Sequence, residues 1–407
     1  MSVDRIKKDL ETIKDFTTPC EEGTTRLSYT PAYRDAADYV ITQMKAAGLE
    51  PMEDGAGNIW GVRKGKNPDA PKIISGSHLD TVKCSGYFDG QAGIICALEA
   101  ARMMEDNNDR LEGDYEVLAT IMEEGARYQN LTGSKLAMGV FGEDMLDSMA
   151  DEDGITLRQA MKNYGLSGDI AGICRKDENI KAFIEIHMEQ GRKLEKGRLD
   201  LGIVETIWGC RWFTLTAKGV TAHPSTAMAE RKDTLLASAK LISRISDIVS
   251  EQYVGKATVT VGKMNLYPGN INAIPSRTQF SMDFRTGYEK YFHELDAILK
   301  KEIKRAEDEY RVEFSYEIFS YTPPTPNSKN IQDALDAAIK EQGFSSMHLD
   351  SGAGHDAMVF GTKWPIGMMF VPSRLGLTHC KEEWTDYGNL EKASKVLYTA
   401  VKNLDAQ

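Results

Sequence analysis

Ile73-Ile-Ser-Gly-Ser-His78-Leu-Asp80-Thr81 is the stretch that decides the fold. A short apolar run leads into Gly and Ser, then into a histidine, with an acid two residues further on. Strands of open α/β sheets end in this way, because such sheets hold ligands beyond the carboxyl ends of their strands. Residues two apart in an extended segment share a face, so we expect the Asp80 carboxylate to accept the second ring N–H of His78. This bond would fix the tautomer that a metal ligand needs.

Outward from this stretch, helical and strand-like patterns alternate between residue 30 and about residue 200. Such alternation predicts an α/β domain whose central mixed sheet carries helices on its faces. The expected helices lie at 33–47 and 90–104, and the expected strands at 58–63, 72–75, 115–122 and 182–186.

A different pattern occupies residues 211 to about 320, where the order is β-α-β-β-α-β, the split ferredoxin-like arrangement. The proline-rich segment Thr322-Pro-Pro-Thr-Pro-Asn327 ends it. A helix at 330–341 and a buried strand at 366–371 then resume the α/β pattern. We therefore expect a discontinuous catalytic domain, residues 1–210 and 322–407, with a lid or dimerisation domain inserted at 211–321.

Composition excludes several classes of function. The chain has 407 residues, with 49 Lys and Arg against 61 Asp and Glu and a net charge of −12, and no basic run is interleaved with aromatics. Nucleic acid is therefore not an expected partner. The longest apolar runs, 92–101 and 366–371, are far shorter than the ~20 residues of a membrane span. The six cysteines form no C-x-x-C pair and the amino-terminal segment has no secretory apolar core, so we expect a cytoplasmic protein with reduced thiols.

Chemistry-bearing residues gather at the ends of the expected strands and helices. Each has an ordinary alternative: a hydrogen-bonded structural histidine, a turn aspartate, or a solvated pair of acids. Adjacent carboxylates repel unless a cation or a proton lies between them, and their convergence with histidines on one sheet edge favours two divalent ions. The residues concerned are His78, Asp89, Glu123, Glu124, His187 and His379.

A phosphate-binding alternative rests on Ser351-Gly-Ala-Gly-His-Asp-Ala357, which fits G-x-G-x-x-A. Residues 343–350 before it do not form a convincing strand pattern, and no acid lies about 20 residues beyond it. We therefore do not expect a dinucleotide site.

In these motifs the chain resembles the M20 metallopeptidase/amidohydrolase superfamily. The resemblance is to its N-carbamoyl-L-amino-acid hydrolase, allantoate amidohydrolase and β-ureidopropionase branch. The correspondence runs over most of the chain. It rests on Gly76-Ser-His-Leu-Asp-Thr-Val82, Phe88-Asp-Gly90, Glu123-Glu-Gly-Ala-Arg127, His187-Met-Glu-Gln-Gly191, Asn272-Ala-Ile-Pro275 with Asp283-Phe-Arg285, Ser351-Gly-Ala-Gly-His-Asp-Ala-Met358, and Phe370-Val-Pro372 followed by His379 and Glu383.

The resemblance implies roles for some of the matching residues. It implies two divalent ions, Zn²⁺ or Mn²⁺ with Co²⁺ and Ni²⁺ as alternatives, bridged by Asp89, with Glu123 as the general base. It also implies a homodimer formed through the inserted domain, whose histidine reaches the active site of the partner. The remaining metal ligands would be His78, Glu124, His187 and His379, and the substrate contacts would be Gln190, His223, Asn272, Arg285, Gly352 and His355.

Four of these expected substrate contacts could instead have an ordinary structural role. His355 could be an outer hydrogen-bonding residue, and Arg285 could form a surface ion pair. Asn272 could be an ordinary turn amide, and Gln190 a solvated loop residue. His223 is the expected oxyanion donor, and Arg285 offers a planar fork for a substrate carboxylate.

The expected activity is hydrolysis of the ureido carbon–nitrogen bond of an N-carbamoyl-L-amino acid or a related ureido acid such as allantoate or ureidopropionate. This places the chain among amidohydrolases that act on carbon–nitrogen bonds other than peptide bonds, with a small anionic substrate. An aminoacylase or dipeptidase is the alternative within the superfamily. A non-catalytic binding scaffold is a third hypothesis, which the complete ligand set and Glu123 disfavour.

The sequence also departs from the family pattern. The loop after His223, Pro224-Ser-Thr-Ala-Met228, is one residue shorter than usual, and Ser85-Gly86 stands where relatives have Gly-Gly. Gly269-Asn270 replaces Asn-Ala, and Lys381 replaces the usual proline. The metal set is complete, so these changes do not argue against catalysis. They cluster around the expected lid and pocket and therefore leave the identity of the substrate open.

Overall fold

The computed structural model describes residues 2–407, and the chain divides into two units. The first unit comprises the chain up to Glu205 together with Asn327–Leu349 and His355–Gln407. The second comprises Thr206–Pro326 and Asp350–Gly354. The division therefore falls a few residues outside the expected limits of 211 and 321, and a short later segment joins the second unit.

The first unit is built on the mixed sheet that the sequence predicts. The strand order of this sheet is β1-β2-β4-β3-β5-β14-β6-β12, and β13 pairs with β6. Strand β12 and the last two residues of β6 and of β13 are counted with the second unit. The pairs β3/β4, β3/β5 and β5/β14 are parallel, whereas β1/β2, β2/β4, β6/β14 and β6/β12 are antiparallel. The strands are β1 Glu50–Glu53, β2 Ile59–Arg63, β3 Lys72–His78, β4 Tyr115–Thr120, β5 Ile180–Met188, β6 Leu201–Ile207, β12 Thr325–Pro326, β13 Ser346–Ser351 and β14 Ile366–Val371.

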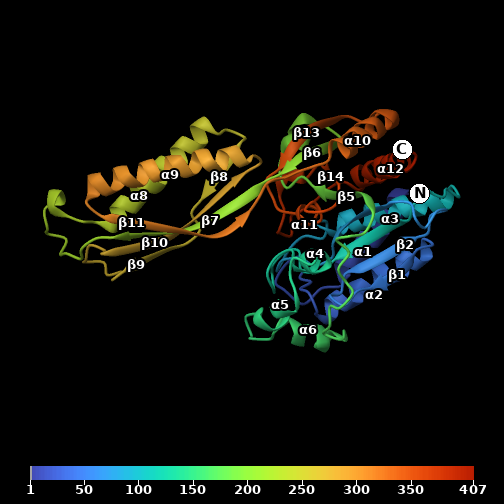
Figure 1. Ribbon diagram of the computed structural model, residues 1–407, viewed down its shortest axis with the longest axis horizontal. Coiled ribbons are helices and arrows are strands. Elements are labelled where there is room, and N and C mark those ends of the chain that lie inside the picture. Colours follow the sequence, from blue (N-terminus) through green and yellow to red (C-terminus); the bar gives the residue numbers. More distant parts are fainter. Residues whose placement is uncertain (1) are drawn as a thin grey trace. The chain divides into compact units, whose positions relative to one another are not determined.

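Helices cover this sheet. Every residue of β4 and β14 is buried, as is usual for strands whose two faces are both covered. Helix α3 packs on β3, β4 and β5, while α10 and α12 pack on β14 (Figure 1). The helices are α1 Ser2–Asp15, α2 Pro31–Ala46, α3 Gln91–Asp106, α4 Thr132–Ala137, α5 Glu143–Ser148, α6 Leu157–Tyr164, α7 Lys193–Gly197, α10 Lys329–Gln342, α11 Asp356–Phe360 and α12 Tyr387–Asp405, with a 3-10 turn η2 at Arg374–Gly376.

Local sequence explains how such a helix begins. Thr30 is the N-cap of α2 and accepts a hydrogen bond from the Tyr33 N–H, and Pro31 occupies the first turn, where no amide donor is needed. Tyr33, Val40 and Met44 then recur at helical spacing and are all buried. The pattern places one apolar face of α2 against the strands β1 and β2 that it contacts.

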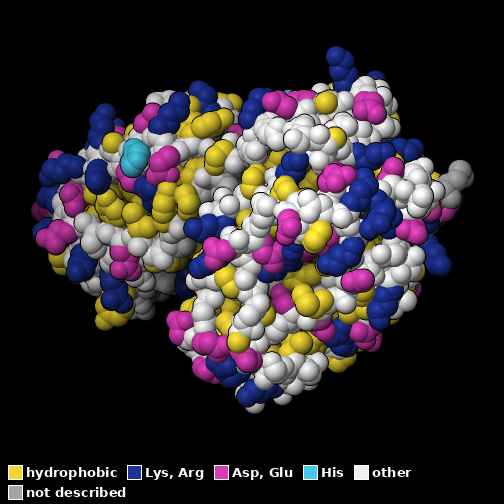
Figure 2. Space-filling view, turned by 45° about the vertical axis from the view of Figure 1, so that its right-hand side comes forward, with side chains coloured by type: hydrophobic (Ala, Val, Ile, Leu, Met, Phe, Trp, Pro, Cys, Tyr) yellow, Lys and Arg dark blue, Asp and Glu magenta, His cyan; other side chains and the backbone are white. Residues whose placement is uncertain are grey.

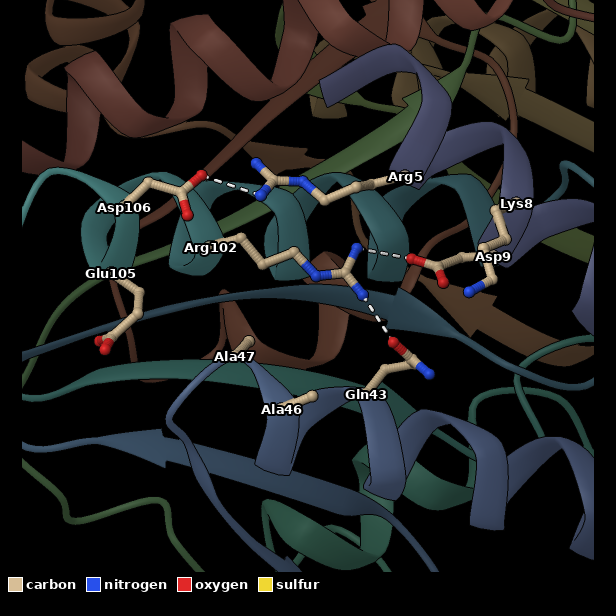
Figure 3. A pocket seen from close by; sticks show the side chains of 9 residues that line it. All are labelled: Arg5, Lys8, Asp9, Gln43, Ala46, Ala47, Arg102, Glu105 and Asp106. Atoms are coloured by element: carbon tan, nitrogen blue, oxygen red, sulfur yellow. Dashed lines mark hydrogen bonds and ion pairs between the residues drawn. The ribbon is translucent and has the colours of Figure 1, made fainter. Parts of the chain in front are cut away.

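Polar side chains tie α1, α2 and α3 together around a cavity of about 270 Å³ (Figure 3). Arg102 in α3 pairs with Asp9 in α1 at 2.6 Å and donates to the Gln43 side chain in α2 at 2.9 Å. Arg5 pairs with Asp106 at 2.8 Å. The charges in this cavity compensate one another, and none of the expected metal ligands lines it.

The second unit contains an antiparallel sheet in the order β11-β7-β10-β8, with β9 paired to β10. Its core includes Phe213, Phe284 and Phe292, which lie between this sheet and the two long helices α8 and α9. The elements are β7 Gly209–Lys218, η1 Met228–Glu230, α8 Thr234–Gln252, β8 Ala257–Thr260, β9 Met264–Tyr267, β10 Arg277–Thr286, α9 Glu289–Tyr310 and β11 Glu313–Thr322.

Two strands differ from the sequence analysis. The stretch 343–350 was not expected to be a strand, yet β13 occupies Ser346–Ser351 and pairs with β6. Its composition misleads because polar residues alternate with Met347 and Leu349, and several of its side chains are only partly buried. The short strand β9 was not predicted, and all four of its residues are exposed.

The surface agrees with the charge balance of the sequence. Lys and Arg side chains are interspersed with Asp and Glu over the face shown in Figure 2. None of the helices within residues 2–407 combines the length and apolar character that crossing a membrane requires.

Candidate metal centre

The expected metal ligands all belong to the first unit and lie at one edge of its sheet. His78 is the last residue of β3, and His187 lies next to the last residue of β5. Glu124 follows β4, Asp89 precedes α3, and His379 follows β14. Because β3, β4, β5 and β14 are parallel neighbours, their carboxyl ends meet at this edge.

Asp89 is at the centre of the cluster. Its Oδ1 lies 2.8 Å from His187 Nε2 and 3.3 Å from His78 Nε2, and its Oδ2 lies 3.3 Å from His379 Nε2. His379 Nε2 is also 3.3 Å from Glu124 Oε2. The side chains thus form two possible cation sites that share Asp89: His78 with His187, and Glu124 with His379.

Hydrogen-bond chemistry tests whether these residues suit a cation. His78 Nδ1 faces the Asp80 carbonyl at 3.0 Å, and His187 Nδ1 faces the Met188 carbonyl at 3.0 Å. A carbonyl only accepts, so each Nδ1 carries the ring proton, and in the neutral ring Nε2 presents a lone pair to the Asp89 carboxylate. Two acceptors at this distance repel unless a positive charge lies between them.

A second observation supports the same conclusion. Glu124 Oε1 is buried and has no hydrogen-bond partner among the described residues. An unsatisfied buried carboxylate oxygen is costly, and a cation ligated by that oxygen would remove the cost. Imidazole nitrogens with carboxylate oxygens suit borderline divalent ions such as Zn²⁺. The residues therefore fit a divalent cation centre.

The electrostatics of the metal-free cluster show the same need for positive charge. Burial alone lowers the pKa of His78, but Glu123, Asp89 and Glu124 outweigh it and raise that pKa well above its usual value. Burial alone raises the pKa of Asp89, but the histidines, His187 first, hold it well below its usual range.

Glu123 lies beside the cluster in surroundings that raise its pKa. It is buried at 9% exposure beside the cluster, with its Oε2 3.8 Å from His78 Nε2. Burial, with the charges of Glu124 and Asp356, raises the pKa of Glu123 well above its usual value despite the opposing effect of His78. A carboxylate with a raised pKa holds a proton more readily, as proton transfer near neutral pH requires.

Asp80 acts differently from the sequence expectation. Its backbone carbonyl, rather than its carboxylate, faces His78 Nδ1. The carboxylate instead accepts the backbone N–H of Glu123 at 3.1 Å and of Glu124 at 3.3 Å. The expectation was wrong in this detail because β3 ends at His78, so the rule for alternating faces of a strand no longer holds two residues later. Asp80 thus still contacts three residues of the centre, His78, Glu123 and Glu124.

Gln190 lies close to the same cluster. Its Nε2 donates to Asp89 Oδ2 at 3.0 Å, and its backbone has a positive φ of 54°. His355 is buried, and its ring centroid is 4.6 Å from that of His187. Burial lowers the pKa of His355 well below its usual value, so the ring is neutral. Both side chains thus adjoin the expected ligands.

Glu383 and Thr378, for which the sequence predicted no role, also contact the cluster. The Thr378 hydroxyl donates to Asp89 Oδ2, and Glu383 accepts the Asp89 backbone N–H at 3.0 Å. Glu383 was noted only as part of a motif. Its partner Phe88 lies 295 residues earlier, so no local pattern indicates the contact.

The other expected contacts lie in the second unit, which is described by itself. His223 and Asn272 are exposed, and the bridge between Ala222 and Ile274 places their segments side by side. Arg285 pairs with Asp283 at 3.0 Å, which is the ion-pair alternative considered for it. Gly352 belongs to this unit as well, and an added Cβ there would lie 4.0 Å from the Trp208 ring.

The chain is similar to known proteins along most of its length. The model of peptidase family M20/M25/M40 matches residues 74–403. An N-carbamoyl-L-amino-acid amidohydrolase of Paenarthrobacter aurescens is 36% identical over 99% of this chain and 98% of its own length. An allantoate amidohydrolase of Bacillus subtilis is 34% identical, with coverage of 95% and 94%. An amidase of the hydantoinase/carbamoylase family from Burkholderia multivorans has a TM-score of 0.91 at 29% identity, covering 100% of this chain and 98% of that one.

Proposed function

Because the chain belongs to the M20/M25/M40 peptidase family, we propose that it is a metal-dependent amidohydrolase that cleaves the ureido carbon–nitrogen bond of an N-carbamoyl-L-amino acid or a related ureido acid. The observation that carries the proposal is Asp89, which is shared by two groups of histidine and carboxylate ligands. The relatives named for carbamoyl amino acids and allantoate indicate the substrate class.

Two divalent ions, Zn²⁺ or Mn²⁺, would be held by His78 and His187 on one side of Asp89 and by Glu124 and His379 on the other. Such ions lower the pKa of bound water and polarise a carbonyl. Glu123 accepts the proton of the attacking water and then donates it to the leaving nitrogen. The carbamate left by loss of ammonia releases carbon dioxide and the free amino acid.

The second unit supplies the remaining contacts in this proposal. His223 serves as the oxyanion donor and Asn272 as a polar contact to the substrate, and both side chains are exposed and available. Arg285 binds the substrate carboxylate as a planar fork, exchanging Asp283 for it. In this scheme the first unit is catalytic, and the second forms the lid and the interface of a homodimer.

Gln190 and His355 are the proposed substrate contacts of the first unit. Gln190 already donates to Asp89, so it contributes an amide beside the cation centre. His355 is neutral and packed against His187, and it contributes a ring nitrogen near the substrate. All six cysteines are free thiols, which is consistent with a cytoplasmic enzyme.

The test is a substrate panel. Purified full-length protein is freed of metal, loaded with Zn²⁺, Mn²⁺, Co²⁺ or Ni²⁺, and assayed for ammonia release from N-carbamoyl-L-amino acids, allantoate and ureidopropionate. We expect release from at least one compound and about a 10²- to 10⁴-fold lower turnover in Glu123→Gln with metal retained. No ammonia with any metal would refute the ureido activity. Turnover of N-acetyl amino acids or dipeptides instead would identify an aminoacylase or peptidase, which the family description also covers.

A further inference from the structure

Glu383 joins the two chain segments that carry Asp89 and His379. Its side chain is buried at 1% exposure. Oε1 accepts the backbone N–H of Phe88 at 2.8 Å and of Asp89 at 3.0 Å. Oε2 accepts the backbone N–H of His379 at 3.2 Å and lies 3.1 Å from the Thr378 hydroxyl. Each carboxylate oxygen thus serves one of the two segments.

The approach of the segments depends on features built around Glu383. A Cβ added to Gly86 would lie 2.4 Å from the Glu383 Cβ and 2.5 Å from its Oε1, so only glycine fits there. Next to Glu383, Trp384 packs edge-on against Phe88, with ring centroids 5.2 Å apart. Polar and aromatic contacts therefore hold the segment 86–89 against 383–384.

The bond from the His379 N–H to Glu383 is important because the backbone of His379 is strained. His379 has a φ of +58°, in the left-handed region that residues other than glycine rarely adopt. Its side chain is 46% exposed, so packing alone does not fix it. The bond from the His379 N–H to Glu383 is the contact that ties the backbone of this strained residue to the segment of Asp89, beside the side-chain contacts of His379 and Thr378 with Asp89.

The two possible cation sites do not depend on Glu383 to the same degree. His78 and His187 lie on strands, and their rings are oriented by the carbonyls of Asp80 and Met188. His379 lies on a loop, and its backbone bonds to Glu383. Loss of Glu383 should therefore disturb the site of Glu124 and His379 far more than the site of His78 and His187.

We propose that Glu383 is a positioning residue that sets the spacing of Asp89 and His379 and so determines the occupancy of the cation site they form with Glu124. The proposal rests on the metal dependence in the proposed function. It does not depend on which ureido acid is the substrate.

The chemistry of Glu383→Gln makes the test specific. A glutamine amide can accept on one side only, because its NH₂ group faces either the Phe88 and Asp89 donors or the His379 donor. One of the two segments therefore loses its acceptor at almost unchanged volume. Glu116→Gln is the matched control, since Glu116 is also buried at 1% exposure but binds Arg175, away from the expected ligands.

The measurement is the metal content and affinity of full-length protein, by elemental analysis after dialysis and by calorimetric titration of the metal-free protein with Zn²⁺. We expect two ions in the wild type and in Glu116→Gln. In Glu383→Gln we expect the ion of Glu124 and His379 to be weakened about 10- to 100-fold, and the ion of His78 and His187, which shares Asp89, to be weakened much less. The melting temperatures of the metal-free proteins report any general loss of stability.

Several outcomes would overturn the proposal. Two ions of wild-type affinity in Glu383→Gln, equal weakening of both ions, or the same loss in Glu116→Gln would each do so. If Glu383→Gln does not fold, Glu383→Asp, which keeps both acceptors but shortens their reach, must weaken the ion of Glu124 and His379 more than the ion of His78 and His187. A wild-type protein that bound no metal would refute the proposed function as well, whereas a failed ureido panel with the expected metal pattern would refute only the activity.

Discussion

His187 Nε2 lies 2.8 Å from Asp89 Oδ1, although His187 Nδ1 already faces the Met188 carbonyl at 3.0 Å. In the absence of a cation or an added proton, this arrangement places a lone pair against a carboxylate. A divalent ion that binds only the folded protein stabilises it, by about 2.7 kcal/mol at a hundred times the dissociation constant. We therefore expect chelation to lower the melting temperature and added Zn²⁺ or Mn²⁺ to restore it, as measured by calorimetry. An identical melting temperature with and without the chelator would contradict this.

Replacement of Asp80 by asparagine should weaken metal binding at the cation centre while the protein still folds. The carboxylate accepts the N–H groups of both Glu123 and Glu124, and an asparagine amide can accept only one of them. We expect about a 10- to 100-fold loss of metal affinity, measured by titration of the metal-free protein. Asp54→Asn is a control in the same unit, because Asp54 binds Asn58 and Trp60 instead. Equal losses of metal affinity in both variants would contradict a specific role.

A third prediction concerns the tautomer of His223, which contacts Ser225. The Ser225 backbone N–H donates to His223 Nδ1 at 3.2 Å, so the neutral ring carries its proton on Nε2. That nitrogen is then free to donate to a developing oxyanion. Nitrogen NMR of histidine-labelled protein, with His223→Ala for assignment, should show an unprotonated Nδ1 in both the wild type and Ser225→Ala, which keeps the backbone donor. A protonated Nδ1 on a neutral ring would argue against the assignment.

The same assignment predicts how activity responds. Once a substrate has been found, His223→Ala should lower turnover about 10²- to 10³-fold, as loss of an oxyanion donor does elsewhere. Ser225→Ala, which removes only the hydroxyl 2.8 Å from Nδ1, should stay within about threefold of the wild type. Equal losses in the two variants would mean that the Ser225 hydroxyl, rather than the backbone N–H, orients the ring.

Glu178 gives a prediction for pH. Burial alone would raise the pKa of Glu178, but hydrogen bonds from Arg175 and Lys72 outweigh it and lower that pKa below its usual value. A lowered folded-state pKa contributes stability that is present above the unfolded value, about 4.3, and is lost as the pH falls through the folded value. At pH 7, Glu178→Gln should therefore lower the free energy of unfolding by about 1 kcal/mol or less, and the melting temperature with it. The difference in melting temperature between wild type and variant should shrink between about pH 4.5 and pH 3. A difference that grew on acidification would contradict this sign.

The sequence indicated which candidate ligands the fold brings together, because these residues lie at the ends of elements with strong patterns. His78 and His187 end or nearly end apolar strands, and Asp89 precedes a long buried helix. Parallel strands bring such ends together whatever the lengths of the connections between them. The expected mixed sheet follows from the same apolar runs.

The features that escaped prediction are those that depend on tertiary contacts. The acceptor for His78 changed from the Asp80 carboxylate to its carbonyl because the chain leaves the strand after His78. Glu383 meets Phe88 across almost three hundred residues, so local spacing carries no signal of the contact. The strands β9 and β13 are exposed or partly polar, and only their pairing with β10 and β6 defines them.

The position of β14 has a consequence for how the chain acquires its structure during synthesis. This strand lies between β5 and β6 in the sheet, yet it is made after the whole of the second unit. Until it emerges, the two neighbouring strands have unpaired backbone edges and the histidine that follows β14 is missing from the centre. In the nascent chain the position of β14 between β5 and β6 therefore stays unfilled until β14 is made. Pairing between strands so far apart in the sequence is slow. That interval is when this protein would depend most on chaperones to avoid aggregation.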